Sequence, residues 1–335
     1  MAERAELISG DHRVAQLIED SGRAAESDDF FRSRALYDAE GVSHSLVVGG
    51  DGDDELALPL LVHAIGDSGR RDAITPYGYP GAAIRVERSS PPDPSALDWS
   101  ATGLVSIFVR DRIGRPPCFA RGTRRSAVQV HDPARERHIR SRFAEQIRQN
   151  ERLGYHVEVL HGPDATVEHR LSFHAAYTQT MRGVEAAERY FFEPDYFRTI
   201  LQFERSWLVL ARSPERATAA GAILVFSDGM LHYYLGGTAE VHRPRSPFKN
   251  VVDSTIGLAD ELGLPLNLGG GVKPGDGLED FKRGFSNAEL PFVTHEIVCD
   301  PEAYASLGAG REDSRFFPAY RAPVEGRSAD PPRPR

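Results

Sequence analysis

The second half of the chain alternates short apolar runs with segments whose apolar residues recur at helical spacing. The apolar runs predict strands, and the helical spacing predicts amphipathic helices. The predicted strands are 155–160, 206–211, 219–226, 230–235, 266–268 and 291–298, and the predicted helices are 165–182, 194–204, 246–263 and 278–284. Ser227-Asp228-Gly229 lies between two of these strands and predicts a hairpin turn. Within the 246–263 helix, Val252, Ile256 and Leu262 are expected to face inward.

The first half has a weaker pattern. Residues 1–40 are expected to be helical, and their buried candidates are Phe30, Phe31, Leu36 and Tyr37. Strands are predicted over 45–48, 56–62 and 104–109. A strong helix is predicted to start at Asp132-Pro133 and to end at Gly154, since Ile139, Phe143 and Ile147 form one apolar stripe between these capping signals.

The order strand, two helices, three antiparallel strands, helix, strand, helix, strand is that of the GNAT acyltransferase fold. We therefore predict an α+β protein of two tandem GNAT-like domains with a cleft near their junction. The expected parts are an N-terminal domain (1–132), a linking helix (133–154), a C-terminal domain (155–321) and a disordered tail (322–335).

Composition narrows the class of protein. The 335 residues carry a net charge of −9, which argues against a general nucleic-acid-coating protein. No apolar stretch reaches the ~18 residues of a membrane helix, and no signal peptide is visible, so a cytoplasmic protein is expected. Cys118 and Cys299 are too few for a disulfide framework or a cysteine zinc site, and no metal site is predicted.

The basic residues are unevenly distributed. Only Lys249, Lys273 and Lys282 are lysines. Residues 121–152 hold nine arginines against four acids, a local surplus of five positive charges. Such a strip suits salt-sensitive docking of one RNA, and it equally suits an exposed helix with mixed charges.

The turn that should open the helix after the fourth GNAT strand is unusual. A GNAT enzyme that uses acetyl-CoA holds the pyrophosphate on backbone amides of a glycine-rich turn at this point. Here no glycine occurs from 238 to 256, and Pro244 and Pro247 remove two amide donors. The sequence therefore predicts a GNAT fold that lacks the usual backbone site for the pyrophosphate of coenzyme A. Gly269-Gly270-Gly271 lacks the dinucleotide fingerprint and is a weak signal for ligand contact.

Three motifs follow one another at intervals that resemble the FemX/FemAB-like transferases, the Fem ligases that build peptidoglycan cross-bridges. They are Tyr233-Tyr234-Leu235-Gly236-Gly237-Thr238, Leu268-Gly269-Gly270-Gly271 and Leu278-Glu279-Asp280-Phe281-Lys282-Arg283-Gly284-Phe285. Upstream, Thr180-Met181-Arg182, Tyr190-Phe191-Phe192 and Asp195-Tyr196-Phe197 fit as well, and Tyr77-Gly78-Tyr79-Pro80-Gly81 is similar to a loop in the first half of such proteins. No extended charged heptad stretch is present, so the compact form without a helical arm is expected.

The resemblance implies transfer of an amino acid from aminoacyl-tRNA to an amine, which forms a peptide bond without a ribosome. The acceptor would be a peptidoglycan precursor or a peptide natural product. No cofactor is expected beyond the aminoacyl-tRNA donor, no membrane insertion is expected, and a monomer is the expected state. Because the ester is already activated, the protein needs to position the amine and stabilise an oxyanion.

The candidate site residues follow from this chemistry. Lys282 would supply positive charge near the 3′ end of the tRNA, and Phe281 would stack on a terminal base; the alternative for Lys282 is a surface lysine at a helix end. Substrate contacts are expected from Arg182, Arg189, Tyr190, Tyr233, Tyr234, Tyr77 and Tyr79. Tyr233 and Tyr234 alternate along a strand, so at most one of the pair faces the cleft. The expected tRNA contacts are Arg124, Arg125, Arg135, Arg140, Lys249 and Lys273.

Two other functions stay open on the sequence alone. One is an acyl-CoA-dependent N-acyltransferase on the same fold, which the missing glycine-rich turn disfavours. The other is a non-catalytic relative that keeps the cleft and binds a ligand.

Overall fold

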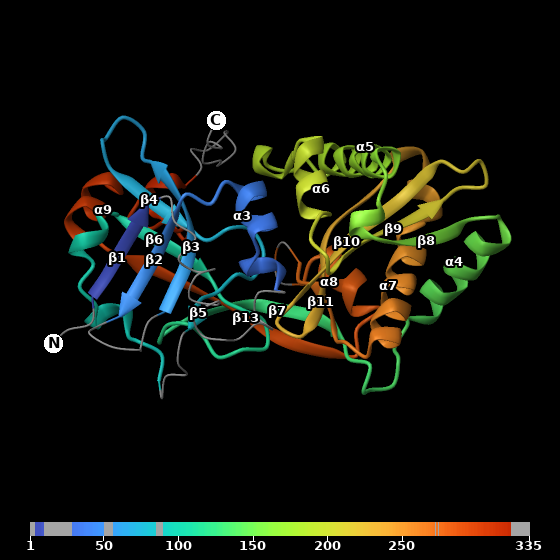
Figure 1. Ribbon diagram of the computed structural model, residues 1–335, viewed down its shortest axis with the longest axis horizontal. Helices are drawn as coiled ribbons and strands as arrows, with labels where there is room; N and C mark the ends of the chain where they lie inside the picture. Colours follow the sequence, from blue (N-terminus) through green and yellow to red (C-terminus); the bar gives the residue numbers. More distant parts are fainter. Residues whose placement is uncertain are drawn as a thin grey trace. The chain divides into compact units, whose positions relative to one another are not determined.

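The computed structural model describes residues 4–9, 29–49, 56–84, 90–271, 273 and 275–322. Contacts divide the chain into two compact units (Figure 1): unit 1 comprises Met1–Arg125 and Phe292–Arg335, and unit 2 comprises Ser126–Pro291. The division falls inside strands β7 (Thr123–His131) and β13 (Ala288–Val298). These bounds differ from the predicted ones at both ends, because the second half of β13 pairs with a strand of unit 1, from Thr294 opposite Arg110 onward.

Unit 1 is built on a sheet with strand order β1-β2-β3-β4-β6-β13, in which only β4 and β6 pair in parallel. Its apolar core includes Leu46, Leu58, Ile107 and Phe119. The elements are β1 (Arg4–Ser9), η1 (Phe30–Arg32), α3 (Arg34–Glu40), β2 (His44–Gly49), β3 (Leu56–Ala64), β4 (Arg71–Ile74), β5 (Ala83–Ile84), η2 (Pro94–Ala96), η3 (Ser100–Thr102), β6 (Ser106–Arg110), α9 (Pro301–Leu307) and η7 (Ala319–Arg321).

The prediction for the N-terminal segment is partly wrong. Residues 4–9 form a strand rather than a helix, because they pair antiparallel with β2 and bury Ala5 completely. This pairing outweighs the helix propensity of Ala, Glu and Leu. The helix is confirmed over Arg34–Glu40, and the four predicted core residues from Phe30 to Tyr37 are buried. Most of the predicted helix before Asp29 and the tail after Ala322 lie outside the described residues.

Unit 2 has strand order β7-β12-β11-β10-β9-β8, with β11 and β12 parallel and the other pairs antiparallel. Its element order confirms the predicted GNAT order. The elements are α4 (Ser141–Arg152), β8 (His156–His161), η4 (Gly162–Asp164), α5 (Val167–Gly183), η5 (Glu188–Tyr190), α6 (Pro194–Ile200), β9 (Ser206–Arg212), β10 (Thr218–Ser227), β11 (Met230–Thr238), η6 (Glu240–Arg245), α7 (Phe248–Leu262), β12 (Leu266–Gly269) and α8 (Gly277–Arg283).

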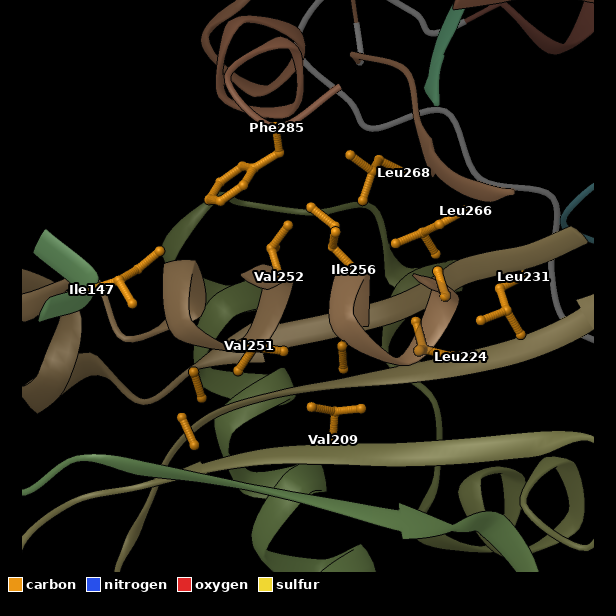
Figure 2. Packing of buried hydrophobic residues seen from close by; sticks show 14 of the residues in the cluster. Ile147, Val209, Leu224, Leu231, Val251, Val252, Ile256, Leu266, Leu268 and Phe285 are labelled. Carbon is orange, nitrogen blue, oxygen red and sulfur yellow. The ribbon is translucent and has the colours of Figure 1, made fainter. Parts of the chain in front are cut away.

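Helices cover both faces of the unit 2 sheet (Figure 1): α5 packs on β10 and β11 from one side, and α7 packs on β8 to β12 from the other. Gly237 lets α5 approach closely, since a Cβ there would lie 2.5 Å from the Cα of Tyr177. Figure 2 shows the core on the α7 side, where Val252 and Ile256 point toward Phe285 and Leu268 while Val251 lies on the side of the helix that faces Val209. Leu262, predicted to face inward, is instead 44% exposed at the end of α7.

The predicted linking helix starts later than its capping signals suggest. Residues 132–140 do not form an α-helix, and α4 begins at Ser141. The side chain of Asn287 forms hydrogen bonds with the backbone of Asp132: it accepts from Asp132 N at 2.7 Å and donates to Asp132 O at 3.0 Å. An Asp132 carbonyl engaged in this way is not available to accept the first hydrogen bond of a helix. Of the predicted apolar stripe, Phe143 and Ile147 lie on α4 and are each 5% exposed, whereas Ile139 precedes the helix and is partly buried.

Within the described ranges, no helix combines the length and the apolar content that a membrane crossing requires.

Candidate functional site

Lys282 lies near the end of helix α8, with its side chain folded into unit 2. The helix begins at a cap from Asp276, whose side chain accepts from Glu279 N at 2.8 Å. The Lys282 residue is only 9% exposed, its Nζ donates to the carbonyl oxygen of Gly270 at 2.7 Å, and the same atom lies 5.5 Å from the ring centroid of Tyr233. Lys282 is therefore a buried ammonium group and not a surface lysine at a helix end.

The three glycines before α8 shape this environment. Gly269 has φ of +79°, a left-handed conformation that a side chain disfavours. A Cβ on Gly271 would lie 2.4 Å from Oδ1 of Asp276. The run therefore turns the chain so that the Gly270 carbonyl meets Lys282, while Asp276 caps the helix beside it. The contacts of these glycines are therefore with Lys282 and Asp276 of the same chain.

Burial controls the protonation of the two polar groups. Desolvation lowers the pKa of Lys282 from 10.5 to about 8, although the Asp276 carboxylate opposes the shift. At neutral pH the side chain is thus still mainly charged, and it loses its proton within the range of a mildly alkaline buffer. Burial raises the pKa of Tyr233, which keeps its phenol neutral.

A small cavity of about 20 Å³ adjoins these two residues, which is room for about one water molecule. Its remaining walls come from β10, α7, β12 and α8: Ala222, Phe248, Val251, Val252, Thr255, Leu268, Leu278 and Phe281. Gly236 provides space for the Tyr233 ring, since a Cβ at that position would lie 2.6 Å from the Tyr233 hydroxyl. The cavity is therefore apolar apart from Lys282, Tyr233 and Thr255.

An open groove of about 520 Å³ lies on the other side of Phe281, which lines both spaces. Its other lining residues come from α4, the start of α7 and α8: Arg142, Phe143, Gln146, Ser246, Lys249, Gly277 and Asp280. Lys249 Nζ and the Arg142 guanidinium lie 4.9 and 5.3 Å from the ring centroid of Phe143. The cavity holds one buried cation, and the groove holds two accessible ones.

The other predicted substrate residues have surroundings of their own in the two units. Tyr234 faces the α5 side of the sheet, where its hydroxyl lies 2.6 Å from that of Tyr196. Arg182 lies at the end of α5, and Arg189 packs over the Tyr190 ring in η5. Of the predicted tyrosine pair, Tyr233 is thus the one beside Lys282. Tyr77 and Tyr79 belong to unit 1, where the Tyr79 ring makes edge contacts with Phe31 and Phe292.

Most arginines of the predicted basic strip are paired with carboxylates. Six of the nine arginines over 121–152 have a carboxylate within 4.0 Å; they are Arg121, Arg125, Arg135, Arg137, Arg140 and Arg142. Arg124 and Lys273 are exposed. Of the predicted tRNA contacts, Lys249 lines the groove, and Arg140 supports it by pairing with Asp280 through two bonds of 2.9 Å.

Sequence reasoning missed Arg142 and Gln146, and it treated Phe143 only as a core residue. The local signal is that Arg142 and Gln146 are four residues apart, which places them on the same side of a helix, next to Phe143. That signal does not reveal that this side of α4 faces the start of α7. Two buried asparagines fix the contact: Asn150 Nδ2 donates to Asn250 Oδ1 at 2.8 Å, and Asn250 Nδ2 donates to the Ile147 carbonyl at 3.3 Å.

Unit 1 contains a separate buried cluster of metal-ligand types. Asp111, Cys118 and His295 offer ligand atoms within 4.8 Å of one another. Asp111 pairs with His295 Nε2 at 2.7 Å and accepts from the Cys118 amide at 3.0 Å. Burial and the nearby carboxylate raise the pKa of the Cys118 thiol, which favours the protonated form that binds metals poorly. These hydrogen bonds connect the three residues, while His295 Nδ1 is buried without a hydrogen-bond partner in the described part of the chain.

Comparison with known proteins places the fold. No protein-family model and no curated protein matches the chain. Among solved structures, FemX is similar at 12% identity with a TM-score of 0.55, covering 84% of this chain and 97% of that one. L-PGS from Bacillus licheniformis is 12% identical with a TM-score of 0.59, covering 88% and 93%. The C-terminal domain of a putative lysylphosphatidylglycerol synthetase from Agrobacterium fabrum is 15% identical with a TM-score of 0.54, covering 87% and 95%.

The chain therefore shares the fold of FemX and of these two synthetase structures. This finding confirms the predicted α+β class and the Fem-like resemblance of the fold. At these identities the likeness concerns the fold alone.

Proposed function

We propose that the protein is an aminoacyltransferase that moves an amino acid from aminoacyl-tRNA to an amine and forms an amide bond. The observation that carries the proposal is the buried Lys282 ammonium, which faces a cavity the size of one water molecule beside an open cationic groove. A peptide natural product or a peptidoglycan precursor would supply the amine. The fold that the chain shares with FemX supports this choice.

The chemistry requires little from the protein beyond position and charge. A neutral amine attacks the ester carbonyl of the aminoacyl-tRNA, and the carbonyl oxygen becomes an oxyanion. The amine nitrogen forms the new C–N bond and loses a proton, while the ribose oxygen leaves and gains one. A desolvated ammonium near the oxyanion stabilises this intermediate far more than the same group in water would. We assign that role to Lys282, whose Nζ donates to the Gly270 carbonyl oxygen.

The start of α7 supports an RNA donor over coenzyme A. The segment before it is the 3-10 helix η6, which contains Pro244, and the N-cap of α7 is Pro247. Neither proline has an amide hydrogen, so this end of the helix lacks donors that a pyrophosphate would need. Cationic side chains stand at the same place instead, as Lys249 and Arg142 line the groove there.

The test is a transfer assay with a bulk pool of charged tRNA, a short peptide with a free amine as acceptor, and mass spectrometry of the product. We expect product with the wild-type protein, at least a hundredfold less with Lys282→Met, and partial recovery with Lys282→Arg, which keeps the charge. Arg148→Ala on the exposed side of α4 serves as the control. Acetyl transfer from acetyl-CoA to the same peptide, with none from charged tRNA, would contradict the proposal and favour an acyl-CoA-dependent enzyme.

A further inference from the structure

The groove between α4, α7 and α8 carries positive charge that the protein does not neutralise. Arg140 and Asp280 pair through two bonds of 2.9 Å, so their charges largely cancel. Arg142 Nη2 lies 3.6 Å from Asp280 Oδ2, beyond hydrogen-bond distance, and its side chain is 67% exposed. Among the described residues, none places a carboxylate within 4.0 Å of Lys249 Nζ. Arg142 therefore lies near one carboxylate, which Arg140 already engages, and within the described part of the chain Lys249 lies near none.

These two cations are held near each other. Both lie over the ring of Phe143, which Gly284 and the rings of Phe281 and Phe285 support from behind. Partial burial and the charge of Arg142 lower the pKa of Lys249. Desolvation is the larger cause of this shift and the Arg142 charge adds to it, so an anion bound between the two cations would relieve the second contribution. Guanidinium and ammonium groups together are typical of phosphate recognition.

The neutral part of the groove fits a nucleotide. Gln146 and Ser246 add uncharged hydrogen-bonding groups, and the half-buried ring of Phe281 forms an aromatic wall. Aromatic side chains bind single-stranded bases by stacking, at about 1–3 kcal/mol per base, beside cations that follow the phosphates. Because Phe281 also lines the Lys282 cavity, a base stacked on this ring would lie next to that cavity.

We propose that this groove binds the 3′-terminal phosphodiester of an RNA donor through Arg142 and Lys249, so that side chains replace the backbone amides that hold a pyrophosphate in coenzyme A-dependent GNAT proteins. This inference rests on the proposed function for its choice of RNA over other nucleotide phosphates. Of the described residues that line the groove, Asp280 is the one that carries a carboxylate, and Arg140 pairs with it through two hydrogen bonds.

The experiment measures binding of a labelled single-stranded RNA ending in CCA by fluorescence anisotropy over a series of salt concentrations. We expect Arg142→Ala and Lys249→Ala each to weaken binding by about tenfold. Each should also reduce the slope of log K against log salt by about 0.7, the value for one lost phosphate contact on a single strand. Arg148→Ala removes the same charge from the exposed side of α4, outside the groove, and should leave the slope unchanged.

Equal slopes for the groove variants and Arg148→Ala would overturn the inference. Coenzyme A provides a second arm: if the variants lose coenzyme A binding and retain RNA binding, the groove is not an RNA site. The transfer assay separates this failure from that of the proposed function. Transfer that needs Lys282 but shows an unchanged KM for tRNA in the groove variants would refute the groove alone. Absence of transfer from every charged tRNA would refute the proposed function, whatever the groove binds.

Discussion

Replacing Lys282 by methionine should make the protein more stable while abolishing its activity. The lowering of the Lys282 pKa from 10.5 to about 8 means that the folded protein holds this proton less tightly than the unfolded chain does. At 1.36 kcal/mol per pKa unit, the buried ammonium costs about 3 kcal/mol at neutral pH. Methionine has a similar length and no charge, so this cost disappears. Loss of the hydrogen bond to the Gly270 carbonyl offsets about 1–2 kcal/mol of the gain.

The pH dependence gives the sharper test. Between pH 8 and 10.5 the unfolded chain carries the Lys282 proton and the folded protein does not, so the wild-type protein gains stability as the pH rises. Lys282→Met has no such group and lacks this gain. The stability of the wild type relative to the variant should therefore increase by about 2 kcal/mol between pH 7.5 and 9.5.

The assay is urea unfolding at the two pH values, with Lys273→Met as the matched control because that lysine is exposed. All other titrating groups are common to the variant and the wild type and cancel in the difference. If Lys282→Met were less stable than the wild type at pH 7.5, and the difference did not change with pH, the lysine would be a structural residue. The reasoning from its burial would then be wrong.

Three further substitutions test packing around the site and in unit 1. Gly236→Ala should reduce transfer activity more than stability, because its Cβ would lie 2.6 Å from the Tyr233 hydroxyl and displace that ring; an unchanged kcat would count against a role for Tyr233. Gly284→Ala should lower the unfolding free energy by about 1–3 kcal/mol, since its Cβ would lie 2.2 Å from the Phe143 ring; a normal urea midpoint would contradict this. Asp111→Ala leaves His295 Nε2 and the Cys118 amide without their buried hydrogen-bond partner and should cost about 1–3 kcal/mol in urea unfolding, with the RNA affinity of any folded protein unchanged.

The fold of unit 2 was largely predictable because its signals are local. Each strand and helix there has its own periodicity, and Gly229 and Gly263 adopt the positive φ expected of a hairpin turn and a helix end. The errors occurred where a distant residue decides the conformation. Asn287 binds the backbone of 132–136 and delays α4, and pairing with β2 converts residues 4–9 to a strand.

The candidate site was predictable only in part, for a similar reason. The motif around Phe281 and Lys282 could be recognised in the sequence. The sequence did not show that the Lys282 side chain folds inward and donates to the carbonyl of Gly270, twelve residues earlier. Strand alternation placed Tyr233 and Tyr234 on opposite faces without showing which one meets α8. Arg142 could not be identified, since its partner Lys249 lies on another helix and nothing in their local sequences links them.

The electrostatics of unit 2 favour a functional interpretation of both the cavity and the groove. A buried ammonium that costs about 3 kcal/mol is not explained by stability, because an apolar side chain of similar length would fill the same space without that cost. The like charges of Arg142 and Lys249 also oppose each other, and Asp280 is already engaged by Arg140. Ionisable residues that lower the stability of the fold and that cluster in adjoining cavities are typical of a site that binds and converts a substrate. Phe281 lines both spaces, so a ligand with a phosphate in the groove and an ester carbonyl beside the cavity would lie next to the groove cations and Lys282 at once.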